Sequence, residues 1–104
     1  MKPLHKRHEV ILDVAEIYGW IAQRDQDAAE RFLTAVDHGF DQIQKHPAIG
    51  WARRWKNPKL QGVRSWRVPQ FHNFLVFYRE EALTIEVYAV LRGARHIEHE
   101  LRKR

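Results

Sequence analysis

Residues 62–98 read GVRSWRVPQFHNFLVFYREEALTIEVYAVLRGARHIE, and this stretch has the composition of three consecutive β-strands. β-Branched and aromatic residues dominate it, and these residue types favour extended backbone. Pro69 ends the first run, and residues 80–82 join the second run to the third as a tight hairpin. We expect strands over residues 63–68, 73–80 and 83–91. The stretch therefore predicts a small, mainly antiparallel sheet.

The third strand alternates in a way that assigns its two faces, because successive side chains of a strand point to opposite sides of the sheet. One set is apolar throughout: Leu83, Ile85, Val87, Ala89 and Leu91. The other set is mixed: Thr84, Glu86, Tyr88, Val90 and Arg92. We expect the apolar set to pack on the rest of the protein and the mixed set to form a more polar face.

The first half of the chain supplies two amphipathic helices that can cover this sheet. Apolar residues recur at helical spacing over residues 8–24 and again over residues 28–45. Asp27 is the expected N-cap of the second helix, and Pro47 ends that helix. The short break between the helices predicts an antiparallel hairpin. Residues 95–103 form either a short final helix or a frayed tail.

At this length the chain is expected to be a single domain, residues 1–104. The predicted class is α+β, with an N-terminal antiparallel helical hairpin packed on a small, mainly antiparallel β-sheet. No apolar run is long enough to cross a membrane, and the basic N-terminus lacks the apolar stretch of a secretory signal. There is no cysteine, so a reducing cytoplasm is the expected compartment.

The net charge of +5 is unevenly distributed along the chain. Residues 1–52 hold six Lys/Arg and eight Asp/Glu, whereas residues 53–104 hold twelve Lys/Arg and five Asp/Glu. A basic half of this kind attracts polyanions or acidic proteins through its long-range field. In the alternative interpretation, the charge is an ordinary property of a small domain and marks no binding surface.

Most catalytic and cofactor motifs are absent from the sequence. The five glycines stand alone, so there is no glycine-rich phosphate loop, and Ser65, the only serine, lies in a predicted strand instead of a nucleophile elbow. The His5/His8 and His96/His99 pairs lack the His-Glu-x-x-His order of zinc helices, and we expect them to be solvated surface residues. The sequence predicts neither a metal ion nor a cofactor.

Arginines and tryptophans are the residues best suited to binding a partner. Guanidinium groups hold phosphates or carboxylates, and the same groups can instead pair with acids inside the fold. For Arg64 and Arg79 both interpretations stay open. Trp51 and Trp55, in the loop of residues 47–62, either touch a partner or close over the core as a lid, and we favour the lid. The candidate binding residues are Arg64, Arg67, Arg79, Arg95, Trp51 and Trp55.

The order of these segments resembles the RelE/ParE superfamily, the toxins of bacterial type II toxin–antitoxin modules. The resemblance covers nearly the whole chain, and it rests on the helical hairpin from ILDVAEIYGWIAQRD to FDQIQKHP, followed by GVRSWRV, FLVFYRE and IEVYAVLRGARHIEHEL. The last two segments resemble the paired strands of the family and its Gly-x-Arg turn. Members usually open with a β-strand, and the short, polar KPLHKRHE implies that this strand is brief or irregular here.

The superfamily has two functional branches. RelE-like members are ribosome-dependent mRNA endonucleases, whereas ParE-like members are associated with inhibition of DNA gyrase. Compared with RelE-like members, Phe74 or a neighbour replaces a phosphate-holding arginine and Leu101 replaces a C-terminal tyrosine, whereas Arg95 matches the arginine of the closing turn. Loss of such groups impairs acid–base chemistry, although His96 or His99 could substitute as an acid. The long helical hairpin is also ParE-like.

The resemblance therefore implies a ParE-like toxin that acts by binding DNA gyrase, and not by bond-breaking chemistry of its own. It also implies a cognate, ParD-like antitoxin that lays an amphipathic helix and an extended segment beside the helical hairpin, giving a toxin–antitoxin hetero-oligomer. Two alternatives are kept. One is a RelE-like mRNA endonuclease acting on ribosomes with bound mRNA, and the other is an inactive interaction module.

Overall fold

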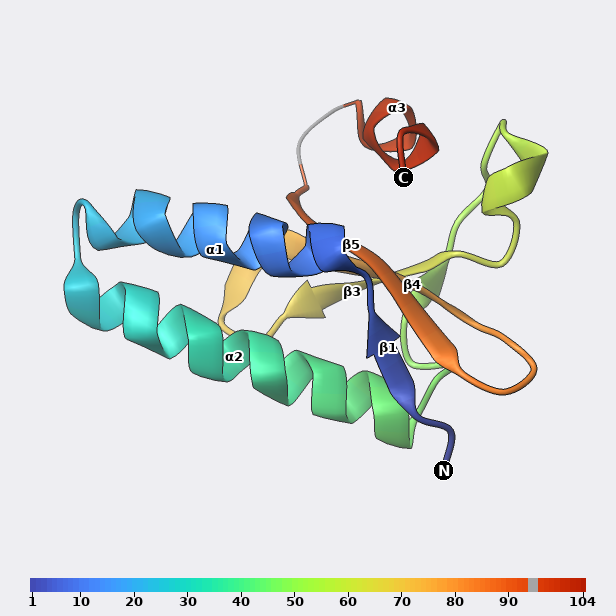
Figure 1. The fold of residues 1–104 in the computed structure, drawn as a ribbon, viewed down its shortest axis with the longest axis horizontal. Helices are drawn as coiled ribbons and strands as arrows, with labels where there is room; N and C mark the ends of the chain where they lie inside the picture. The colour runs from blue at the N-terminus through green and yellow to red at the C-terminus, as the bar shows by residue number, and fades with distance from the viewer. Residues whose placement is uncertain (94–95) are drawn as a thin grey trace.

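The computed structural model describes residues 1–93 and 96–104. Two long helices lie side by side on one face of a five-stranded sheet, and a short third helix packs on the other face (Figure 1). The elements are β1 (Leu4–Lys6), α1 (His8–Ala22), α2 (Gln26–Lys45), β2 (Trp51–Ala52), the 3₁₀ turn η1 (Pro58–Leu60), β3 (Arg64–Val68), β4 (Phe71–Glu80), β5 (Ile85–Arg92) and α3 (Ile97–Arg102). The predicted α+β class and helical hairpin are confirmed.

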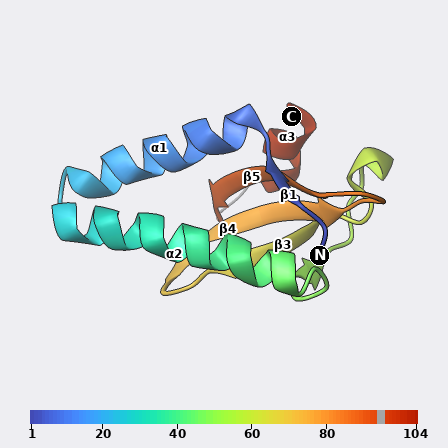
Figure 2. The same ribbon diagram turned by 60° about the horizontal axis from the view of Figure 1, so that its bottom comes forward.

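The strands follow one another across the sheet in the order β1-β5-β4-β3-β2. β1 runs parallel to β5, and the other neighbours are antiparallel. The sheet is therefore mixed but mostly antiparallel, as predicted, and the N-terminal strand is indeed brief, at three residues. In Figure 2, α2 crosses in front of the sheet and α1 lies above it, and the tight β4–β5 hairpin projects at one end.

The α1–α2 hairpin turns at Asp25. The Ala28 amide donates a hydrogen bond to the Asp25 carboxylate (3.0 Å), so Asp25 is the N-cap of α2. The prediction of Asp27 was wrong because α2 begins at Gln26, before its apolar pattern starts. The two helices are buried to different extents. α2 buries seven residues along one face, whereas α1 buries only Val10 completely.

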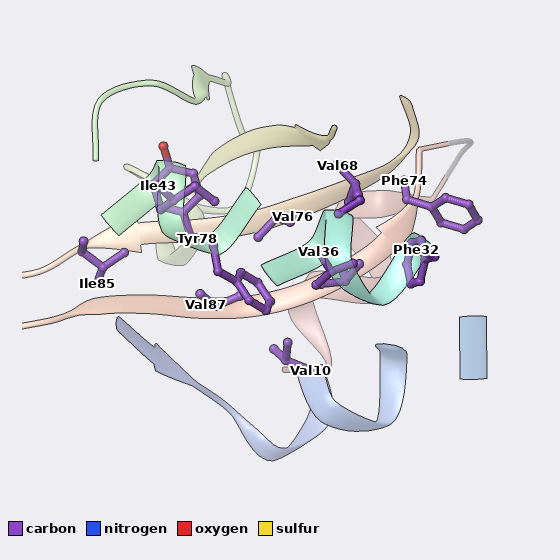
Figure 3. Close-up of a cluster of buried hydrophobic side chains, with 13 residues drawn as sticks. Val10, Phe32, Val36, Ile43, Val68, Phe74, Val76, Tyr78, Ile85 and Val87 are labelled. Carbon is purple, nitrogen blue, oxygen red and sulfur yellow. The ribbon is translucent and has the colours of Figure 1, made fainter. Parts of the chain in front are cut away.

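The main core lies between the helical hairpin and the sheet, and α2 contributes most of its helical side chains (Figure 3). Phe32 projects from α2 and makes edge-on contacts with Phe71 and Phe74 of β4, at ring-centre distances of 5.4 and 5.3 Å. Such edge-on pairs add to the free energy gained by burying the rings. The aromatic group fixes the N-terminal half of α2 to the start of β4.

Tyr78 connects this core to the segment that follows α2. Its hydroxyl donates a hydrogen bond to the Pro47 carbonyl oxygen (2.7 Å) and accepts one from the Gly50 amide (2.8 Å). A Cβ atom added at Gly50 would lie 2.5 Å from the hydroxyl oxygen, so this approach requires glycine. Burial raises the pKa of Tyr78 above its ordinary value of 10.0.

A bulge in β5 reverses the faces that we predicted for the second half of this strand. Tyr88 is an extra residue between Val87 and Ala89, which pair with consecutive residues of β4. Val90 therefore joins the main core, whereas Ala89 and Leu91 pack on the opposite face. The prediction that Ala89 and Leu91 share a face with Val87 was wrong, because one inserted residue moves every later side chain to the other side.

The opposite face of the sheet carries a second apolar cluster, and not the more polar surface that the sequence predicted. Its buried members are Trp55, Leu60, Val63, Leu75, Phe77, Tyr88, Ala89 and Leu101. The segment between β2 and β3 supplies three of them, and α3 supplies Leu101. The prediction was wrong because these covering segments are distant from β5 in the sequence, and alternation within one strand does not reveal them. The tail forms a helix at residues 97–102.

Candidate functional site

Arg79 lies on the second face of the sheet, and each nitrogen of its guanidinium has a partner. Nη1 donates hydrogen bonds to the carbonyl oxygens of Lys59 and Gln61, both at 3.0 Å. Nη2 donates to the Tyr88 hydroxyl (2.7 Å), and Nε donates to the Glu81 carboxylate (3.2 Å). Arg79 therefore holds the segment before β3 against the β4–β5 hairpin. This geometry favours the structural interpretation of Arg79.

Tyr88 belongs to the same cluster. Its hydroxyl donates a hydrogen bond to Glu81 at 2.9 Å. Burial and this hydrogen bond raise the pKa of Tyr88, and the same bond holds the pKa of Glu81 below its usual range. The Tyr88 ring also lies 4.3 Å from the guanidinium carbon of Arg7 and 5.3 Å from that of Arg79. Each of the two arginines also has an acid partner: Arg79 pairs with Glu81, and Arg7 pairs with Glu86, both at 3.2 Å.

Arg64 has a similar role at the other side of the sheet. Its Nη1 donates to the carbonyl oxygen of Gly50 (2.9 Å), with that of Ala48 at 3.5 Å. Next to it, the Trp66 indole donates to the Gln42 side chain of α2 (3.0 Å). Arg64 therefore fixes the segment that follows α2, and Trp66 fixes β3 to α2 itself. The structural interpretation again accounts for the arginine.

The two loop tryptophans differ. Trp55 is buried in the second cluster, where its Nε1 donates to the Val63 carbonyl oxygen (3.0 Å) and its ring lies edge-on to Phe77. Trp55 is therefore the lid that we favoured. Trp51 belongs to the two-residue strand at the sheet edge and is 70% exposed. The lid prediction was wrong for Trp51, because within the described residues nothing covers the outermost strand at this point.

Exposed cations gather near Trp51. Trp51 pairs with Ser65, two residues before Arg67, whose side chain is exposed. Arg53 and Arg54 follow β2 directly and are also exposed. Arg53 donates to the Ser65 hydroxyl (3.2 Å) and lies over the aromatic rings of the second cluster. We call this surface, formed by Trp51, Arg53, Arg54 and Arg67, the basic edge.

The structure thus separates the predicted binding residues into two groups. Arg67 and Trp51 come together at the basic edge, exposed. Arg64 and Arg79 instead donate hydrogen bonds to backbone carbonyl oxygens inside the fold. Arg95 lies outside the described residues.

Asp13 and Arg104 form a polar contact that sequence reasoning missed. The two carboxylate oxygens of Asp13 accept hydrogen bonds from the Arg104 guanidinium at 2.8 and 2.9 Å. Asp13 also accepts the amide of Val90 (3.0 Å), and Arg104 donates to the carbonyl oxygen of Tyr88 (3.2 Å). The hydrogen bond from Asp13 raises the pKa of Arg104. These side chains satisfy backbone groups of β5 beyond the point where β1 ends.

α1 exposes large apolar side chains on more than one of its sides. Ile11 is 58% exposed, Leu12 55% and Trp20 44%. Ile11 borders a shallow groove between α1 and α2, which we call the hairpin groove. Its apolar lining is Val10, Ile11, Val14, Leu33, Val36 and Phe40. The sequence contained a signal for this exposed apolar surface. α1 has only three charged acids and no Lys or Arg among its 15 residues, so most of its circumference is uncharged. Helices that are apolar on several sides are usually covered by other parts of a structure or by a partner.

Within residues 1–93 and 96–104, no three His, Asp or Glu side chains gather in a way that could hold a metal ion. In the same part of the chain, none of the helices combines the length and apolar character needed to cross a membrane.

The fold and these surfaces define a class: a small α+β domain whose exposed features, an apolar hairpin groove and a basic edge, suit contacts with other macromolecules. Residues 7–97 match the family described as ParE toxin of the type II toxin–antitoxin system, parDE. The chain belongs to this family, which confirms the ParE-like resemblance.

A solved structure described as the chromosomal ParDE TA system from P. aeruginosa has the same fold. The TM-score is 0.74 at 18% sequence identity, and the alignment covers 90% of this chain and 98% of that chain. At this identity the likeness concerns the fold. No curated protein matches the sequence at a significant level.

Proposed function

We propose that this ParE family protein is a cytoplasmic toxin that inhibits DNA gyrase by binding it, and that a cognate ParD-like antitoxin neutralises it in a hetero-oligomer. Membership of the family supports the toxin–antitoxin pairing. The observation that carries the choice of a binding mechanism is the internal use of Arg64 and Arg79. A nuclease needs preorganised cations aimed at a phosphate, and these two guanidinium groups are aimed at backbone carbonyl oxygens.

The hairpin groove is the surface that suits an amphipathic helix of the antitoxin. It runs between two helices, its lining is apolar, and Ile11 at its border is more than half exposed. Amphipathic helices bind such grooves by inserting apolar side chains at helical spacing. Lys6 and Asp37 at the rim would contact the polar side of the bound helix.

The basic edge is the surface that suits the target. Trp and Arg are the residue types that most often dominate protein interfaces, and here Trp51, Arg54 and Arg67 are exposed together. Their positive field favours an acidic surface on the partner and a salt-dependent association rate. The basic edge lies at the β2 end of the sheet, whereas the hairpin groove lies between α1 and α2. In this proposal the target and the antitoxin helix therefore use different surfaces of the toxin.

A direct test combines two assays on purified protein. Gyrase supercoiling should be inhibited, and inhibition should disappear when the ParD-like product of the neighbouring reading frame is added. Translating ribosomes with bound message should leave the mRNA intact, with a competent mRNA interferase as the control. Cleavage of mRNA at the ribosomal A site, with full supercoiling by gyrase, would replace the proposal with the RelE-like alternative.

A further inference from the structure

Two arginines contact the ring of Trp20, on the flank of α1 that faces β5. The guanidinium carbon of Arg24 lies 5.3 Å from the centre of the indole, and that of Arg92 lies 5.5 Å from it. These contacts favour one orientation of the indole, which remains 44% exposed. Within the described part of the chain, neither guanidinium forms an ion pair or a hydrogen bond, although both are exposed. The pair thus offers positive charge beside a fixed aromatic surface.

A groove beside Trp20 connects this aromatic surface with the core. Its lining includes Ile17 of α1, Phe74 of β4 and Arg92 of β5. Phe74 is buried against Phe32, so the floor of the groove is rigid and apolar. The groove lies on the flank of α1 that faces β5, whereas the hairpin groove lies on the flank that faces α2. The groove beside Trp20 is therefore a surface distinct from the hairpin groove.

Gly19 gives independent information about this surface. A Cβ atom added there would meet nothing within 4 Å, so no contact inside the described structure requires glycine at this position. Glycine in the interior of a helix is nevertheless unfavourable compared with alanine. Gly19 lies next to Trp20 and borders the same groove. A partner backbone that passes close over α1 at this point would explain a residue that the free protein does not need.

We infer that Trp20, Arg24, Arg92 and the groove beside them form an anchor site for an acidic, amphipathic segment of the antitoxin, with its backbone passing over Gly19. The inference rests on the proposed function, because it takes the antitoxin as the partner. Charge complementarity selects an acidic segment: carboxylates of the segment pair with the two guanidinium groups that have no acid of their own. A large apolar side chain of the segment occupies the groove on Phe74 and Ile17. Glu16 is the one acid among the groove residues. It would repel an acidic side chain of the segment placed beside it, so the acids of the segment are expected near Arg24 and Arg92 instead.

The test measures the affinity of the full-length protein for the purified ParD-like product of the neighbouring reading frame, by calorimetric titration. Arg92→Glu and Trp20→Ala should each weaken binding by roughly tenfold or more, as expected for charged and aromatic residues at the centre of an interface. Gly19→Ala is the sharpest variant, because it should raise the Tm of the free protein by about 4 °C while weakening the complex. A variant that is more stable alone yet binds less well excludes misfolding as the cause.

The matched controls are Arg31→Glu, which makes the same charge change on exposed α2, and Leu83→Ala, which removes an exposed apolar side chain at the β4–β5 tip. Both should bind the antitoxin as the wild type does. Wild-type affinity in all three test variants would overturn the anchor site and leave the proposed function standing. A wild-type protein that binds no antitoxin would overturn both. If Gly19→Ala or Arg92→Glu instead breaks a dimer of this chain while antitoxin affinity is unchanged, the surface is a contact between copies and the inference is wrong.

Discussion

Asp13 of α1 accepts two hydrogen bonds from the guanidinium of Arg104, and this pair joins the first helix to the end of the described chain, 91 residues away. Both side chains are almost nine-tenths shielded from solvent. Asp13 also accepts a hydrogen bond from the Val90 amide. The carboxylate therefore satisfies a backbone donor of β5 just after the bulge. The contact ties α1, β5 and the segment after α3 into one unit.

Asp13→Ala should therefore destabilise the fold by about 2–4 kcal/mol, because it leaves a shielded guanidinium and a backbone amide without their acceptor. Urea unfolding measures the change. The matched control is Asp41→Ala, which breaks the exposed i,i+4 pair with Lys45 and should cost less than about 0.5 kcal/mol. Equal losses of unfolding free energy in the two variants would show that the Asp13 contact stabilises the fold no more than an exposed ion pair does.

The Tyr78 hydroxyl should contribute to folding stability through two hydrogen bonds at once. Tyr78→Phe removes the donor to Pro47 and the acceptor of Gly50, and it should cost about 1–3 kcal/mol because the Gly50 amide stays buried. Thermal unfolding checks this value. Tyr18→Phe, whose hydroxyl bonds to exposed residues at the surface, is the control and should change Tm little.

Much of the fold followed from the sequence, and the failures have physical causes. The helical hairpin and the strands produced strong periodic patterns with clear stops such as Pro47 and Pro69. The bulge at Tyr88 left no such mark, because both possible faces of β5 are apolar at Val87, Ala89 and Val90. The second apolar cluster depends on segments that meet only in three dimensions.

The candidate site was less predictable than the fold. Arginines on strands look alike in a sequence, whether they donate to backbone carbonyls, as Arg79 does, or stay exposed, as Arg67 does. Trp51 and Trp55 share one loop, yet only Trp55 reaches the core. The binding potential of α1 was visible in its composition, since it lacks basic residues, but the contact of Trp20 with Arg92 requires the folded chain.

Arginines bonded inside the fold and exposed arginines should respond differently to substitution, the first in stability and the second in gyrase inhibition. Arg79→Ala should lower the stability of the protein by about 2 kcal/mol, because the two carbonyl groups and Glu81 lose their donor. Arg67→Ala should leave stability within about 0.5 kcal/mol of the wild type, as exposed substitutions usually do, and weaken inhibition of gyrase. Chemical denaturation and supercoiling assays on both variants measure these effects. The opposite pattern, with Arg79→Ala stable and inactive, would favour a functional role for Arg79.

The Glu81–Tyr88 pair predicts a dependence of stability on pH. Because the folded protein holds the pKa of Glu81 below its ordinary value of 4.5, its contribution to stability is complete above pH 4.5 and is lost as the pH falls through the lower folded pKa. Stability curves of the wild type and of Glu81→Gln, measured by urea unfolding from pH 7 to pH 3, should therefore converge at acidic pH. Parallel curves would show that Glu81 does not contribute in this way.

The central claim is that this ParE family protein acts by binding gyrase, and a supercoiling titration tests it most directly. Relaxed plasmid, gyrase and ATP are incubated with increasing protein, with and without the ParD-like antitoxin. The account predicts loss of supercoiling that saturates with protein concentration and is reversed by the antitoxin. Full supercoiling at saturating protein would contradict it.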